Sequence, residues 1–236
     1  MLLPQVTGLF DKALVEALPK TLQCIAHNGA GYDQIDVSAC TAAKIQVANV
    51  PTAVDDATAD TALFLLLGAI RQFGLAQASL RENKFNASLS LSNDPKGKTL
   101  GILGMGGIGR ALARRCTALG MTIQYHNRSR LSPELEGGAT YVSFDELMSS
   151  SDVVSLNLPL NASTRHIIGR NELRKMKKSA IIINTARGAV IDEKALVEAL
   201  DADEIAGAGL DVYENEPKIQ EGLADHPKAF LLPHVG

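Results

Sequence analysis

The sequence predicts an α/β protein built on a doubly wound parallel sheet. After residue 98, short apolar runs such as 180–184 alternate with segments of helical periodicity. The chain has 236 residues, of which 46% are hydrophobic and only 4% aromatic, and this composition suits aliphatic helices packed on a sheet. The alternation and the composition together favour a parallel sheet with helices on both faces.

The first third of the chain is expected to be a smaller α/β segment. Strands are predicted at 23–26 and 45–50, with a helix from Asp36 between them, and a long helix is predicted from Asp55 to Phe73. The apolar stretch inside this helix is hydrophobic nearly all round, which indicates a helix buried between layers or subunits. Residues 83–98 show no sustained helical or strand periodicity and are expected to form a hinge.

The rest of the chain gives the main sheet. Strands are expected at 99–103, 121–125, 140–142, 152–157, 179–184, 205–210 and 229–232. Helix starts are marked by Ser143, which forms a capping box with Glu146, by Asn171 and by Asp192. In such a sheet ligands bind beyond the carboxyl ends of the strands, so the residues there are the candidates for function.

The turn after the first of these strands is the most specific local signal. Gly104, Gly106 and Gly109 form a G-x-G-x-x-G between an apolar strand and a helix. The first glycine allows a tight turn, the second lets the backbone approach a pyrophosphate, and the third lets helix and strand pack closely. An ordinary strand-to-helix turn is the alternative. The flanking elements favour a dinucleotide-binding Rossmann domain, with the phosphates at the helix N-terminus.

Three later strands end in an arginine, a carboxylate and a histidine, namely Arg187, Glu216 and His234. A guanidinium can hold a substrate carboxylate and polarise a carbonyl group. A histidine can donate a proton as a hydride arrives, and a carboxylate can keep that histidine protonated. Taken singly, these residues would be a surface ion-pair partner, a turn residue and a strand end. Together they are sufficient for reduction of a 2-oxo acid.

Five motifs resemble the D-isomer-specific 2-hydroxyacid dehydrogenase family, which includes glyoxylate/hydroxypyruvate reductases. They are NGAGYDQID, GILGMGGIG, NTARGAVID, GAGLDVYENEP and LLPHVG, in that order, and the similarity runs from about Leu22 to Gly236. The resemblance implies an NAD(P)-dependent oxidoreductase acting on a small 2-oxo or 2-hydroxy acid of the glyoxylate or hydroxypyruvate class. It implies a Rossmann domain at 96–236 and a partial, flavodoxin-like substrate domain at 1–95. It also implies a homodimer through the helix at 55–73.

The resemblance also implies roles for single residues. Arg187 would bind the substrate, His234 would exchange the proton, Glu216 would pair with it, and Asp211 would orient the nicotinamide carboxamide. The substrate carboxylate would lie against the backbone of Asn28, Gly29 and Ala30. Cofactor contacts are implied for Gly104, Met105, Gly106, Gly107, Ile108, Gly109, Leu158, Pro159, Thr164, Thr185 and Ala186.

The end of the second Rossmann strand departs from the NAD pattern. NAD-selective folds place Asp or Glu there, about 20 residues beyond the glycines, to hold the ribose hydroxyls. This chain has Asn127, Arg128, Ser129 and Arg130 instead, which offer donors to a 2′-phosphate. NADP is therefore favoured over NAD, and a basic surface loop with relaxed specificity is the alternative.

The extent of the sequence is the second departure. Family members carry a further βαβ segment before the first strand and a long helix after the final motif, so the chain is expected to be truncated at both ends. Such a chain should bind a dinucleotide while turning over little substrate. A dinucleotide-binding regulatory protein, like the C-terminal-binding corepressors, and an inactive paralogue remain alternatives.

Composition excludes several other classes. The net charge of −3 argues against nucleic acid or an acidic membrane as a partner. Cys24, Cys40 and Cys116 lack metal or disulfide spacing, so neither a metal site nor a disulfide framework is expected. The longest apolar run, 62–70, is too short to span a bilayer, and the start of the chain lacks a signal-peptide pattern. A cytoplasmic location is expected.

Overall fold

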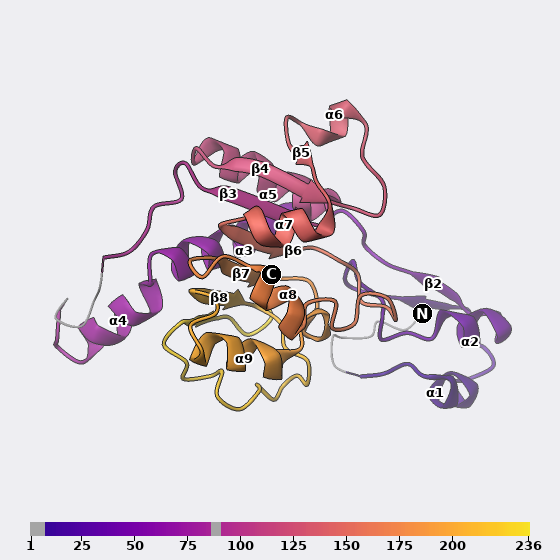
Figure 1. Ribbon diagram of the computed structural model, residues 1–236. Helices are drawn as coiled ribbons and strands as arrows, with labels where there is room; N and C mark the ends of the chain where they lie inside the picture. The colour runs from indigo at the N-terminus through magenta and orange to yellow at the C-terminus, as the bar shows by residue number, and fades with distance from the viewer. Residues whose placement is uncertain (1–7, 86–90) are drawn as a thin grey trace. The chain divides into compact units, whose positions relative to one another are not determined.

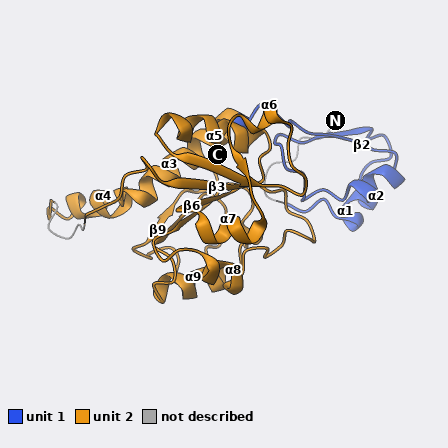
Figure 2. Ribbon diagram, turned by 45° about the horizontal axis from the view of Figure 1, so that its top comes forward, with its two compact units in different colours: residues 1–55 blue, residues 56–236 orange. Residues whose placement is uncertain are grey.

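The computed structural model describes residues 8–85 and 91–236. The chain forms two compact units, Met1–Asp55 and Asp56–Gly236, which Figure 2 colours separately. The predicted hinge at 83–98 lies partly outside the described residues.

The first unit contains a βαβ motif. Its described elements are α1 (Lys12–Ala17), β1 (Cys24–Ala26), α2 (Val37–Ala42) and β2 (Gln46–Ala48). The two strands pair in parallel, which requires the crossover that α2 provides. The predicted helix start is confirmed, since the Asp36 side chain accepts a hydrogen bond from the Ala39 amide at 2.9 Å. The apolar residues that pack between these elements are Val15, Ile25, Ile35, Cys40 and Ile45.

The second unit is a seven-stranded, entirely parallel sheet in the order β5-β4-β3-β6-β7-β8-β9 (Figure 1). Its strands are β3 (Thr99–Leu103), β4 (Thr122–His126), β5 (Thr140–Tyr141), β6 (Val153–Leu156), β7 (Ile181–Asn184), β8 (Gly207–Leu210) and β9 (Ala229–Leu231). The predicted fold class is confirmed. Because β3 pairs with β4 on one side and β6 on the other, the strand order reverses there, and ligands bind at such a switch point.

Helices cover both faces of this sheet. They are α3 (Asp55–Ile70), α4 (Phe73–Arg81), α5 (Gly107–Ala118), α6 (Pro133–Glu136), α7 (Phe144–Ser150), α8 (Arg170–Lys175) and α9 (Glu193–Asp201). Successive side chains of a strand point to opposite faces. Ile181 and Ile183 of β7 accordingly lie in one apolar core with α3 and α5, whereas Ile182 lies in another with α7, α8 and α9.

Two of the three predicted helix starts in this unit are confirmed. Ser143 accepts a hydrogen bond from the Glu146 amide, and Asp192 from the Ala195 amide, at 3.2 and 3.0 Å. The prediction that Asn171 precedes a helix is wrong, because α8 already begins at Arg170. The carboxylate of Glu172, a residue within the helix, accepts a hydrogen bond from the Gly169 amide at 3.2 Å and so pairs one of the free amides at the helix N-terminus.

The predicted single helix at 55–73 is wrong as well. Gln72 adopts a left-handed conformation with φ of 55°, so α3 ends and α4 leaves at an angle of 67°. Among the described residues no single helix is long and apolar enough to cross a membrane. The bent pair of α3 and α4, taken together, reaches the length and apolar composition of a membrane span. Seven residues of α3 are buried.

The division between the units differs from the predicted domain boundary at 95. Buried residues of α3, including Leu65 and Leu66, share a core with the strands of the main sheet. The helix therefore clusters with the second unit, and the division falls after residue 55. Domains at 1–95 and 96–236 stay a prediction.

Candidate active site

The glycine turn lies at the carboxyl end of β3, at the switch point of the sheet. Gly104 has φ of 98°, and a Cβ there would lie 2.5 Å from the Asn157 carbonyl oxygen. A Cβ on Gly109 would lie 2.6 Å from the Gly104 carbonyl oxygen, so strand and helix touch. A Cβ on Gly106 would instead meet no atom of the described chain within 4 Å. The turn thus leaves room for a ligand directly at the N-terminus of α5.

Met105 and Asn127 hold the shape of this turn. The Met105 side chain is buried in the core, and its amide donates to the Asn127 side-chain oxygen at 2.7 Å. Arg110 in α5 donates to the Met105 carbonyl group at 3.3 Å. The backbone of Met105, rather than its side chain, therefore belongs to the turn. The side-chain oxygen of Asn127 is therefore used to hold the glycine turn. Gly107 and Ile108 form the first turn of α5.

The loop after β4 carries the basic residues predicted to favour a 2′-phosphate. Arg128 and Ser129 are exposed. Arg130 donates from Nε and Nη2 to both carboxylate oxygens of Glu136, at 2.7 and 3.2 Å. This guanidinium holds the pKa of the Glu136 carboxyl below its usual range. Tyr125 donates its hydroxyl to the same carboxylate at 2.8 Å. Arg130 is thus tied to its own loop, whereas the side chain of Arg128 is exposed and is not held by Glu136.

Glu216 and His234 meet at the carboxyl edge, although they follow different strands, β8 and β9. The His234 Nδ1 lies 2.8 Å from the Glu216 Oε2. The other carboxylate oxygen accepts from the Tyr213 amide at 2.9 Å, which fixes the acid in its loop. About a quarter of each side chain is exposed, 23% for His234 and 26% for Glu216, so the pair can reach a ligand.

Arg187 lies in the neighbouring loop after β7. The buried Asn184 side chain accepts from the Ala186 amide and donates to the Arg187 carbonyl group, both at 3.0 Å. Arg187 itself donates to the Ala186 carbonyl oxygen at 2.8 Å. A Cβ on Gly188 would collide with the backbone of Tyr213, so the loops after β7 and β8 lie in direct contact. Sequence reasoning missed Asn184 and Gly188; the Arg-Gly pair directly after a strand was the available signal.

Asp211, predicted to orient the nicotinamide carboxamide, is almost fully buried. Its two carboxylate oxygens accept from the Val235 and Gly236 amides at 2.9 and 2.8 Å. Asp211 therefore holds the segment that follows His234. Its contact with a nicotinamide ring stays a prediction.

Three buried side-chain polar atoms have no hydrogen-bond partner among the described residues, and two of them follow strands at the carboxyl edge. These two are the side-chain oxygens Oδ1 of Asn157, after β6, and Oγ1 of Thr185, after β7, whereas the third is Oε2 of Glu193 in α9. Buried polar groups are normally paired, and such exceptions mark places where a ligand or water completes the site. The open turn and these two atoms fit a dinucleotide laid along the carboxyl edge. Asn157 was not predicted.

The remaining predicted cofactor residues line the same strand ends. Leu158 is half-buried and Pro159 exposed. Thr164 donates its hydroxyl to the Pro159 carbonyl oxygen at 2.7 Å, which closes the loop after β6. Ala186 is half-buried beside Thr185. The structure therefore places these residues in the loops after β6 and β7, and their contact with a cofactor stays a prediction.

The predicted substrate cradle lies in the first unit, directly after β1. The Gly29 carbonyl oxygen accepts from the Val50 amide at 3.0 Å, and the Ala30 carbonyl oxygen from the Asn49 side chain at 2.8 Å. Within residues 8–85 and 91–236, the amides of residues 28–31, which include Asn28, donate no hydrogen bond. Consecutive free amides form a concave anion site, so this loop is suited to a carboxylate.

Comparison with known proteins agrees with this arrangement. A family model described as D-isomer specific 2-hydroxyacid dehydrogenase, NAD binding domain, matches residues 63–236. The chain belongs to this family. It is 62% identical to the 4-methyl-2-oxopentanoate reductase A of Aspergillus oryzae, over 98% of this chain and 70% of the relative.

Solved structures of the family have the same fold. A glyoxylate reductase from Paecilomyes thermophila superposes with a TM-score of 0.93 at 60% identity, covering 98% of this chain and 70% of that one. An NADPH-dependent glyoxylate/hydroxypyruvate reductase from Sinorhizobium meliloti, in complex with NADP and malonate, gives a TM-score of 0.89 at 38% identity, covering 97% and 72%. The resemblance predicted from the five motifs is confirmed, and this D-2-hydroxyacid dehydrogenase homologue is an NAD(P)-dependent oxidoreductase by family.

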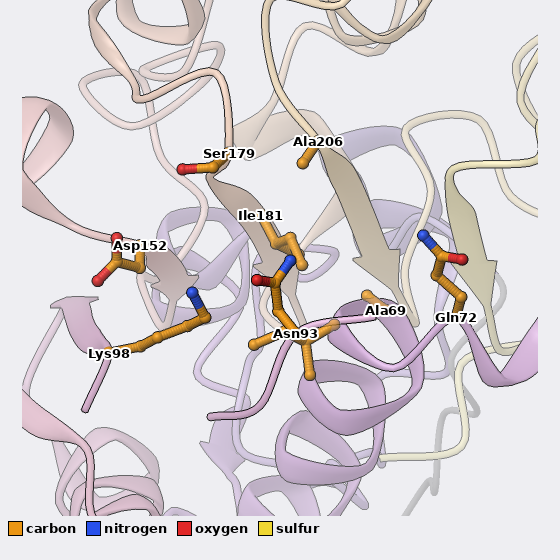
Figure 3. A pocket seen from close by; sticks show the side chains of 9 residues that line it. Ala69, Gln72, Asn93, Lys98, Asp152, Ser179, Ile181 and Ala206 are labelled. Carbon is orange, nitrogen blue, oxygen red and sulfur yellow. The ribbon is translucent and has the colours of Figure 1, made fainter. Parts of the chain in front are cut away.

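The opposite edge of the dehydrogenase sheet has a small cavity of about 40 Å³ (Figure 3). It is lined by Lys98 and Asp152, which directly precede β3 and β6, and by Ser179, two residues before β7. Asp152 accepts from the Thr99 amide at 2.8 Å and from the Lys177 ammonium group at 2.9 Å, so it joins two elements. Sites for organic ligands span roughly 300–1,000 Å³, so this cavity is not a cofactor site.

Proposed function

We propose that this protein reduces a small 2-oxo acid of the glyoxylate or hydroxypyruvate class, with NADPH as the preferred cofactor. The 2.8 Å contact between His234 and Glu216 at the carboxyl edge, beside the Arg187 loop, carries the proposal. Support comes from relatives named as glyoxylate, hydroxypyruvate and 4-methyl-2-oxopentanoate reductases.

His234, Glu216 and Arg187 have separate roles in the proposed reduction. The bound cofactor supplies a hydride to the substrate carbonyl carbon. His234 has Nδ1 engaged by Glu216, so Nε2 is the nitrogen that donates a proton to the carbonyl oxygen. The Glu216 carboxylate stabilises the protonated ring and orients it. Arg187 binds the substrate carboxylate and polarises the carbonyl group. One hydride and one proton convert the 2-oxo acid to the 2-hydroxy acid.

Preference for NADPH is supported by the loop after β4. In residues 127–130 no acidic side chain is present to hold a 2′-hydroxyl, and Arg128 and Ser129 are exposed donors. A guanidinium binds a phosphate through charge-assisted hydrogen bonds, which NADH cannot form at this place. The glycine turn and the unpaired Asn157 and Thr185 oxygens are suited to either cofactor.

We also propose that two copies associate through α3 and α4. An apolar groove of about 250 Å³ lies between these helices and β9, and Phe64, Phe73, Ala76, Gln77, Leu80 and Phe230 line it. Phe64 is 49% exposed and Leu80 is 61% exposed, which is unusual for large apolar side chains close together. A second copy of the same helix pair is the occupant that would cover it. A cytoplasmic location is likewise part of the proposal.

The direct test is an assay of NADPH oxidation with glyoxylate, hydroxypyruvate and bulkier 2-oxo acids, alongside NADPH binding by fluorescence. Turnover of the small acids with weak turnover of the bulky ones supports the proposal. Binding without turnover of any 2-oxo acid contradicts it and favours a dinucleotide-binding regulatory protein or an inactive paralogue. Arg187→Ala serves as the negative control, because it removes the group that holds the substrate carboxylate.

A further inference from the structure

Glu193 is a buried carboxylic acid to which the proposed reaction assigns no role. It is the first residue of α9, and only 3% of it is exposed. Its Oε1 accepts a hydrogen bond from the Glu214 amide at 2.8 Å. Its Oε2 is buried and has no partner among the described residues. Burial of a carboxyl group costs free energy, so a buried acid at this place calls for an explanation.

The atom that Glu193 binds belongs to the loop of the acid–base pair. Glu214 lies two residues before Glu216, and the preceding amide, that of Tyr213, binds Glu216 Oε1 at 2.9 Å. The Glu214 carboxylate in turn accepts from Arg165 at 2.9 Å and from His166 at 2.8 Å. The loop is thus anchored on one side to α9 and on the other to the segment before α8.

The charges around Glu193 favour its neutral form. The groups that face it are Glu214, Glu216 and Tyr213 from the loop after β8, and His166 from the segment before α8. Burial raises the pKa of Glu193 and the two neighbouring acids raise it further, whereas the hydrogen bond from the Glu214 amide and the nearby His166 lower it, and the net change is upward. Burial also raises the pKa of Tyr213 to about 12, so this phenol stays neutral. Burial and the two acids thus disfavour a second full charge beside Glu216.

We propose that Glu193 is a positioning residue for the acid–base pair. Its carboxyl group holds the Glu214 backbone and thereby sets the distance between Glu216 Oε2 and His234 Nδ1. The inference rests on the proposed function only in that this pair exchanges the substrate proton. Glu193 itself touches neither substrate nor cofactor.

The test compares Glu193→Ala with Glu193→Gln. The matched control is Glu198→Ala, a half-buried acid on the same helix that pairs with Arg170 rather than with the loop after β8. Misplacement of a reacting group by about 1 Å can cost about a hundredfold in rate, so Glu193→Ala should lower kcat by about ten- to hundredfold. NADPH binding, which uses the glycine turn, should stay unchanged. Glu193→Gln retains an acceptor for the Glu214 amide and should keep most of the activity. Circular dichroism and thermal melting establish that each variant is folded.

A second readout does not depend on turnover. In the chain labelled with ¹⁵N-histidine, the titration of the His234 ring is followed by NMR, and Glu193→Ala should move its midpoint to lower pH while Glu193→Gln leaves it in place. An unmoved midpoint together with an unchanged kcat in Glu193→Ala overturns the proposal. Equal losses in folded Glu193→Gln and Glu193→Ala overturn it too, because the retained acceptor would then be irrelevant. If the unaltered chain reduces no 2-oxo acid but the midpoint still moves, the proposed function fails and the positioning role stands.

Discussion

At the scale of single residues, the site depends on side chains that are held from two directions. Glu216 is fixed by the Tyr213 amide through one oxygen and contacts His234 through the other. The buried Asn184 shapes the loop of Arg187 in the same manner. A side chain with one bond to its own loop keeps its orientation, so little reorganisation is needed when a ligand binds.

Glu216→Gln should shift reduction to more acid pH. A carboxylate beside an imidazole favours the protonated ring, and its loss makes the proton leave at lower pH, so the upper limit of the pH profile moves down. At pH 7.5 the rate should fall by about a hundredfold, within the range expected for general acid catalysis. The measurement is kcat against pH for glyoxylate reduction. A profile with an unmoved upper limit would remove the proposed role of Glu216, and Glu198→Gln is the control.

Arg128→Ala should weaken NADPH binding and leave NADH binding unchanged. A charge-assisted hydrogen bond contributes roughly 1.5–3 kcal/mol, and each 1.4 kcal/mol is tenfold, so the Kd for NADPH should rise about tenfold or more. Adding Asn127→Asp should reverse the preference, since a carboxylate can hold the ribose hydroxyls. Fluorescence titration gives both dissociation constants. Equal values in the unaltered chain would contradict the preference, and Arg114→Ala, an exposed arginine on α5, is the control.

At the scale of elements, the carboxyl ends of β6, β7 and β8 deliver three loops that touch one another. Gly188 brings the loop after β7 against the backbone of Tyr213, and Glu214 joins the loop after β8 to Arg165. Elsewhere in this unit, α3 buries seven of its residues, whereas α4 runs at 67° to α3 and exposes apolar side chains. The proposed subunit contact is therefore formed mainly by α3 and α4, whereas the site is formed by the loops at the carboxyl ends of the strands.

Leu80→Asp should convert the proposed dimer to a monomer. A charge placed in an apolar contact must be desolvated when two copies associate, which opposes association. Leu135→Asp is the control, because Leu135 is an exposed leucine on α6, outside the groove. Analytical ultracentrifugation of the three proteins over a concentration series measures the change. A monomeric unaltered chain, or a dimer that survives Leu80→Asp, would refute the proposed contact.

At the scale of the whole molecule, Glu193 links stability to pH. Burial raises its pKa in the folded state above the ordinary value of 4.5. The folded state therefore holds a proton that the unfolded state has released at intermediate pH, and the free energy of unfolding falls as pH rises from the unfolded pKa through the folded one. Glu193→Gln cannot titrate, so its unfolding free energy should decline less over this range. Urea unfolding at several pH values measures both slopes, and identical slopes would contradict the raised pKa.

Local pattern in the sequence determined the strands of the sheet, the glycine turn and the positions of the proposed acid–base pair. Apolar runs at 99–103 and 179–184 predict buried parallel strands, and parallel strands place their carboxyl ends at one edge. Glu216 and His234 follow such strands, so their meeting could be predicted, and the structure confirms it.

Tertiary structure alone decided the break at Gln72, the membership of α3 in the main sheet, and the partners of Glu193, Asp211 and Arg130. Glu193 and Glu214 are 21 residues apart, and Asp211 and Val235 are 24 apart. No periodicity relates such positions, because their contact arises when separate strands deliver their loops to one edge. Burial then selects which polar groups must pair, and burial is a property of the packed molecule rather than of any segment.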